Sequence, residues 1–181
     1  MNNNSNTLNE NYPYQHLIIE NVFKEDFYKQ IKNNFPENKL FKPCNNRVKG
    51  VRQDERFVIF LDKKEDFELL ENKNFWLEFY KSFYDKDFLN NIFNIFKLDL
   101  KDKFHIQVQL IYDKKNLILP PHTDVIEKKK IHKYITFLMY IVEDEKLNLS
   151  TELYKIDKNG KINSQNKTFK ICKKAPYKDN H

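Results

Sequence analysis

The chain has 181 residues and a formal net charge of +6, and 40% of its residues are hydrophobic. This length predicts one domain with its own core, and 16 Phe and 10 Tyr argue against an intrinsically disordered protein. The sequence has no run of about 18 apolar residues, which excludes a membrane span. The polar start, residues 1–6, lacks the apolar stretch of a secretory signal. We therefore expect a cytoplasmic protein with no membrane partner.

Lysine accounts for most of the positive charge. Only three of the 32 basic residues are Arg, whereas Asn occurs 23 times and Gly twice. Lys, Asn, Ile, Phe and Tyr have A/T-rich codons, so we ascribe the lysine excess mainly to nucleotide bias. Acids are interleaved with the lysines, as in Lys63-Lys64-Glu65-Asp66, a pattern that predicts a solvated face. The charge therefore disfavours nucleic acid as a partner, and a basic nucleic-acid-binding domain stays only as an alternative.

The two cysteines, Cys44 and Cys172, are too few for a disulfide framework. Their separation also does not fit a zinc-type pair. We expect two reduced, partly buried thiols.

Hydrophobic periodicity changes along the chain. Phe23, Phe27, Ile31 and Phe35 recur every fourth residue and predict an amphipathic helix that Pro36 ends. From residue 104 the period becomes two, which is typical of strands with one apolar face. The predicted elements are strands at 16–19 and 57–60, a helix at 24–34, helical chain over 66–97, and strands at 104–111, 133–142, 151–157 and 168–172, the last two forming a hairpin.

Helices followed by strands indicate the α+β class with antiparallel sheets. Residues 1–11 are an Asn-rich tail that we expect to be disordered, and residues 12–181 form a single domain.

The segment with candidate chemistry is Pro120-Pro121-His122-Thr123-Asp124, between two of the predicted strands. In extended chain, residues two apart point to the same side, so His122 and Asp124 would present an imidazole and a carboxylate together. This is two thirds of the 2-His-1-carboxylate facial triad that binds Fe(II) in non-haem oxygenases. At this composition chance alone supplies about 0.36 such spacings, so the context has to decide.

That context resembles the bacterial and phage 2-oxoglutarate/Fe(II) oxygenases of the prolyl-4-hydroxylase-like group. In this family a Gly-Pro-His-x-Asp segment is followed by a strand of the Leu-x-Tyr-Leu type and then by a Gly-Thr-Glu-Leu-Tyr-like strand. Here Tyr134–Tyr140 and Ser150–Tyr154 follow His122 in that order. Residues 13–23 and the helix ending in Asn34-Phe35-Pro36 also resemble the family's opening strand and helix, so the resemblance spans residues 12–180.

The resemblance implies a double-stranded β-helix core (jelly-roll or cupin-like), with N-terminal helices packed on one sheet. It implies iron ligation by His122 and Asp124, and a Tyr112 hydroxyl bonded to the 2-oxoglutarate carboxylate, although Tyr112 could equally be an ordinary residue at a strand edge. The implied cofactors are Fe(II) and 2-oxoglutarate, with ascorbate as a further candidate. The implied reaction is hydroxylation of an unidentified small-molecule or peptidyl substrate.

Two parts of the family's site have no counterpart, namely the distal iron-binding His and the basic residue that pairs with the far carboxylate of 2-oxoglutarate. Residues 174–180 resemble the lead-in to that strand, so we expect the last strands to be missing and the site to be catalytically incomplete. The other histidines, His16, His105, His132 and His181, do not fit the missing position. A non-catalytic binding module on the same fold is the main alternative, and an open sheet edge would favour a dimer.

Overall fold

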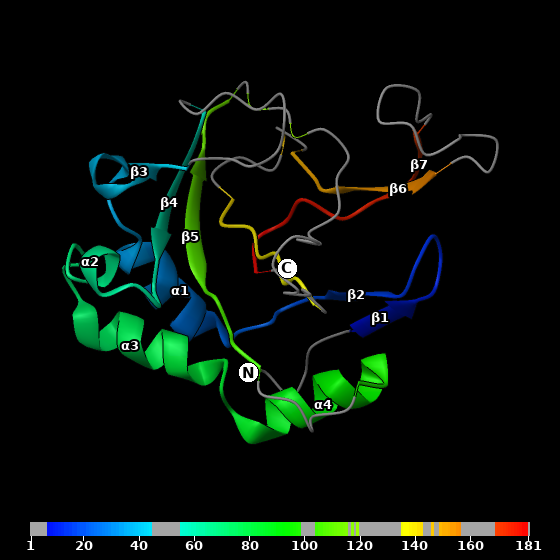
Figure 1. Cartoon of the computed structure of the whole chain (residues 1–181), viewed down its shortest axis with the longest axis horizontal. Coiled ribbons are helices and arrows are strands. Elements are labelled where there is room, and N and C mark those ends of the chain that lie inside the picture. The colour runs from blue at the N-terminus through cyan, green and yellow to red at the C-terminus, as the bar shows by residue number, and fades with distance from the viewer. Residues whose placement is uncertain are drawn as a thin grey trace. The chain divides into compact units, whose positions relative to one another are not determined.

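The computed structural model describes residues 7–44, 55–98, 104–115, 117, 119, 135–142, 146, 149–156 and 169–180. Helices and small antiparallel sheets are mixed along the described chain (Figure 1), so the α+β class is confirmed. The elements, in chain order, are β1 (Thr7–Glu10), β2 (His16–Ile19), α1 (Glu25–Asn34), the 3-10 helix η1 (Asn38–Leu40), β3 (Lys42–Pro43), β4 (Arg56–Phe60), α2 (Lys64–Phe67), α3 (Lys73–Ser82), α4 (Lys86–Phe96), β5 (Gln109–Asp113), β6 (Glu152–Ile156) and β7 (Phe169–Lys174).

Two compact units divide the chain. The first, which we call the terminal unit, consists of Met1–Lys29 and Pro121–His181. The second, the central unit, consists of Gln30–Pro120. The terminal unit holds two antiparallel strand pairs, β1–β2 and β6–β7. The central unit holds the sheet β3–β4–β5 and the helices α2, α3 and α4.

In the central unit, β4 is the middle strand of its sheet, because β3 and β5 pair with it on either side. The ladder between β4 and β5 runs from Arg56 opposite Asp113 to Phe60 opposite Gln109. The neighbours Val58 and Ile59 are 4% and 0% exposed, so both faces of β4 are covered. A strand buried on both faces explains the unbroken apolar run in the sequence at 57–60.

The helical chain predicted over 66–97 is divided into separate helices by side-chain caps. The Asn72 side-chain oxygen accepts a hydrogen bond from the Phe75 amide at 3.2 Å and begins α3. The Asp85 carboxylate accepts from the Phe88 amide at 2.8 Å and begins α4. Such caps satisfy amide donors that a helix start leaves without partners. The aromatic stripe on α3 is core packing, as its buried residues are Phe75, Trp76 and Phe79.

The terminal unit depends on two polar residues near the end of the chain. Asp179 Oδ1 accepts hydrogen bonds from the Tyr28 hydroxyl at 2.6 Å and from the Val142 amide at 2.7 Å. Asn180 is buried and bonds to both backbone groups of Phe23, accepting at 3.0 Å from its N–H and donating at 2.8 Å to its carbonyl. These bonds fasten the segment 175–180 to the start of α1 and to residue 142.

Several predicted elements agree with the structure. The strands at 16–19 and 57–60 and the helix at 24–34 are confirmed to within a residue. The two strands at 151–157 and 168–172 are also present, paired as an antiparallel hairpin.

The predicted strand at 133–142 is wrong over the described residues 135–142, which form no strand. Two of their backbone groups bond to side chains instead, since the Tyr140 carbonyl accepts from the Tyr28 hydroxyl at 3.2 Å and the Val142 amide donates to Asp179. Similarly, the strand predicted from 104 begins only at Gln109.

The prediction of a disordered tail over 1–11 is wrong for Thr7–Glu10, which form β1. This segment pairs antiparallel with β2, with Thr7 opposite Ile19 and Glu10 opposite His16. A backbone ladder satisfies the amides of polar residues as well as those of apolar ones, so an Asn-rich composition did not reveal it.

Asp66 is only 4% exposed, although it lies in the charged run 63–66. One of its carboxylate oxygens accepts from Lys42 Nζ at 2.5 Å and the other from the Phe60 amide at 3.1 Å. The carboxylate therefore links α2 to β3 and to the end of β4. The prediction of a solvated face is wrong at this residue, because its two donors lie outside the charged run.

We expect Asp66→Ala to lower the free energy of unfolding by about 3 kcal/mol, because the Phe60 amide and the Lys42 ammonium lose their acceptor. Urea unfolding followed by circular dichroism measures this difference. Glu65→Ala is the matched control, since Glu65 is exposed and should change stability by less than about 0.5 kcal/mol. Equal losses in the two variants would contradict the role assigned to Asp66.

Burial, followed by the hydrogen bond to Asp179, raises the pKa of Tyr28 above its ordinary value of 10.0. The unfolded chain therefore releases this proton at lower pH than the folded chain, so stability is lost as the pH rises above about 10. We expect the unfolding free energy of Tyr28→Phe to fall less steeply than that of the parent between pH 9 and about 11. Denaturant titrations at a series of pH values test this, and parallel curves would refute it.

Candidate functional site

Tyr112 is the predicted site residue that the structure describes. It lies on β5 opposite Phe57 of β4, with ring centroids 6.1 Å apart, and the Phe41 ring centroid lies 6.2 Å away. Alternation along β5 puts Tyr112 on the same face as Leu110, which is buried, while Ile111 is exposed. Tyr112 is therefore held by aromatic packing on the covered face of the sheet. Its hydroxyl forms no hydrogen bond to another described residue.

An ion pair lies at the end of the β4–β5 ladder, next to the pair formed by Phe57 and Tyr112. Arg56 donates to both carboxylate oxygens of Asp113, from Nε at 2.7 Å and from Nη2 at 2.6 Å. This bidentate geometry is the strongest form of an arginine–carboxylate pair. It fixes the strand end from which the chain continues toward residues 122–124. No sequence motif indicated this pair, because Arg56 and Asp113 are 57 positions apart and are neighbours only through the pairing of β4 with β5.

Cys44 lies next to the same strand end, where its amide donates to the Arg56 carbonyl at 2.8 Å. Burial raises the pKa of the Cys44 thiol, and the Arg56 guanidinium opposes this only in part. A raised pKa keeps the thiol protonated at neutral pH and makes it a poor nucleophile. Cys44 therefore fits a packing role better than a catalytic one.

The predicted iron ligands, His122 and Asp124, lie outside the described residues. Their convergence on one metal ion therefore stays a prediction. Within the ranges that the structure does describe, no three His, Cys, Asp or Glu side chains are grouped as a metal site would require.

Two other histidines are described, and each is engaged by a nearby group. His16 Nδ1 donates to the Tyr14 carbonyl at 2.8 Å, and its Nε2 lies 3.6 Å from Glu10 Oε2. The His105 side chain is 67% exposed, and its Nε2 lies 3.2 Å from Asp62 Oδ2. Among the described residues, neither imidazole lies in a larger group of potential metal ligands.

A scan against protein-family models and searches of the curated proteins and of the solved structures found no match. The family resemblance therefore rests on the sequence motifs alone. Across the described helices, none combines the length and the apolar character that a membrane crossing requires.

Substitutions at Tyr112 should separate its ring from its hydroxyl. We expect Tyr112→Phe to change the unfolding free energy by less than about 0.5 kcal/mol, because the aromatic contacts to Phe41 and Phe57 remain. Tyr112→Ala should cost about 2 kcal/mol, less than a fully buried aromatic would. Thermal or urea unfolding of both variants measures the difference. A large loss in Tyr112→Phe would show instead that the hydroxyl supports the fold.

Proposed function

We propose that the chain is a 2-oxoglutarate- and Fe(II)-dependent dioxygenase scaffold of the prolyl-4-hydroxylase-like group, built on a double-stranded β-helix. The observation that carries the proposal is the place of His122-Thr123-Asp124 in the chain. The motif follows a strand that ends at Asp113, and Ser150–Tyr154, most of which forms β6, comes after it. The sequence order of these segments matches the family's motif order, although residues 135–142, where the family has a strand, form none here.

The donor types suit the proposed metal. A neutral imidazole from His122 and a carboxylate from Asp124 are the ligand types of non-haem Fe(II) sites. Bound Fe(II) and 2-oxoglutarate would supply the oxygen chemistry, in which O₂, 2-oxoglutarate and a substrate C–H bond give succinate, CO₂ and a C–OH group. With two protein ligands identified, we expect Fe(II) binding to be weak.

Tyr112 is the described residue that we assign to the cosubstrate. Its packing against Phe41 and Phe57 and the neighbouring Arg56–Asp113 pair support a fixed ring position. A phenolic hydroxyl on a fixed ring can donate to a carboxylate oxygen with little entropic cost. The proposal therefore gives Tyr112 a positioning role for 2-oxoglutarate and leaves metal binding to His122 and Asp124.

Anaerobic titration with Fe(II) and 2-oxoglutarate tests this assignment, because the cosubstrate chelated to Fe(II) gives a visible charge-transfer band. We expect His122→Ala and Asp124→Ala to weaken Fe(II) binding by about tenfold or more. Tyr112→Phe should weaken 2-oxoglutarate binding roughly threefold to tenfold without changing Fe(II) binding, since one hydrogen bond is lost. His105→Ala is the matched control, because it removes an exposed imidazole outside the motif.

Three results would have distinct meanings. A band that depends on His122 and Asp124, together with succinate formation in air, supports the dioxygenase. The same band without succinate supports a chain that binds but does not turn over, either the binding module or a dioxygenase scaffold that lacks the distal His. Fe(II) binding that is equal in His122→Ala, His105→Ala and the parent would overturn the proposal.

A further inference from the structure

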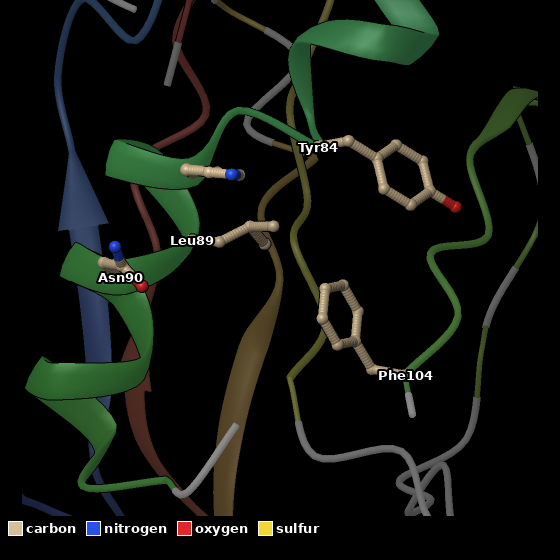
Figure 2. A pocket seen from close by; sticks show the side chains of 5 residues that line it. Tyr84, Leu89, Asn90 and Phe104 are labelled. Carbon is tan, nitrogen blue, oxygen red and sulfur yellow. The ribbon is translucent and has the colours of Figure 1, made fainter. Parts of the chain in front are cut away.

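The central unit contains an open pocket of about 330 Å³ (Figure 2). Tyr84, Lys86, Leu89, Asn90 and Phe104 line it. Three separate pieces of chain supply these residues, namely the turn after α3, the first half of α4 and the segment before β5. The motifs of the sequence did not point to this pocket, because it forms only when residue 104 comes to lie beside α4.

Two exposed aromatic rings flank the pocket. Tyr84 is 38% and Phe104 is 44% exposed, and Figure 2 shows Leu89 pointing from α4 toward the space between their rings. Each ring thus keeps part of its apolar surface exposed, and a ligand that stacks against both would remove that surface from water. The pocket therefore offers apolar contact area that the described chain does not use itself.

Both rings are held in place by neighbours. The Tyr84 hydroxyl lies 3.0 Å from the Tyr80 hydroxyl and 3.5 Å from the Ile106 carbonyl oxygen. The Phe104 ring centroid lies 5.7 Å from that of Phe93. A ligand would thus meet a preformed site and would not have to order its aromatic walls, which lowers the entropic cost of binding.

Lys86 is the charged residue among the described residues that line the pocket. It forms no ion pair with another described residue. Two acids flank it in the sequence, Asp85 and Asp87, and neither is among these lining residues. Asp85 is engaged as the helix cap that accepts from the Phe88 amide at 2.8 Å. Asn90 adds a carboxamide that can donate and accept hydrogen bonds. The charge of the pocket is therefore complementary to an anion.

We propose that this pocket binds a small planar aromatic anion, with its ring against Tyr84 and Phe104 and its negative group near Lys86. A volume of about 330 Å³ is at the lower end for ligand sites and fits one or two fused rings. Tyr112 is not among the described lining residues, and no contact used here involves the iron or 2-oxoglutarate assignments, so this proposal does not rest on the dioxygenase function.

Titration of the full chain with naphthalene-2-carboxylate, followed by amide chemical shifts, tests the proposal. Two matched probes separate the contributions, since naphthalene-2-carboxamide lacks the charge and cyclohexanecarboxylate lacks the planar ring. We expect shifts confined to residues near 84–90 and 104, with the carboxylate binding about threefold to fivefold more tightly than the carboxamide. Cyclohexanecarboxylate should bind roughly fivefold to tenfold more weakly than naphthalene-2-carboxylate.

Variants at exposed positions complete the test without disturbing the core. Lys86→Gln should reduce the affinity for the carboxylate to that for the carboxamide, whereas Phe104→Leu should weaken both by roughly fivefold. Lys81→Gln, which removes an exposed lysine of α3 outside the pocket, is the control and should change neither. Equal affinity for the two naphthalene probes, or equal effects of Lys86→Gln and Lys81→Gln, would overturn the proposal.

Discussion

The pairing of β4 with β5 is the constraint on which the central unit depends. This ladder joins two segments about 50 residues apart in the chain. Across it, Arg56 donates two hydrogen bonds to the carboxylate of Asp113, and at the other end of β4 the buried Asp66 carboxylate accepts from the Phe60 amide and holds α2 to β4. A one-residue slip of β5 along β4 would separate Arg56 from Asp113 and turn Tyr112 to the opposite face of β5, so the register is strongly specified.

In the terminal unit, hydrogen bonds from polar side chains add to the pairing of β1 with β2 and of β6 with β7. The two described residues 179 and 180 bond to three distant stretches of chain, around Phe23, Tyr28 and Val142. The Asn180 carboxamide bonds to both backbone groups of Phe23, as a neighbouring strand would. Because the Asn180 bonds are buried and the Asp179 bonds partly so, a missing partner would leave an unsatisfied group, which makes these contacts specific as well as stabilising.

The sequence predicted the elements that local patterns determine. Four-residue spacing of apolar side chains located α1, and unbroken or alternating apolar runs located β4, β6 and β7. It did not reveal the burial of Asp66 or the lack of a strand at 135–142, because both depend on partners that are far away in the chain. For the candidate site, residue types and spacing predicted the His122–Asp124 pair, and the family resemblance implied Tyr112, but a motif alone does not show whether its side chains converge on one point.

Tyr112 has a packing role in the sheet and a proposed role in binding 2-oxoglutarate, and the two roles are compatible. The sheet requires a flat ring that packs between Phe41 and Phe57, and either Phe or Tyr would meet that requirement. A phenolic hydroxyl adds a polar end that the aromatic packing does not need. The Tyr112 hydroxyl is therefore free of any demand from the ring packing, and the proposed function gives it a carboxylate oxygen of 2-oxoglutarate as a partner. The packing of β5 and the proposed binding of 2-oxoglutarate thus use different parts of the same side chain, and neither involves the metal ligands.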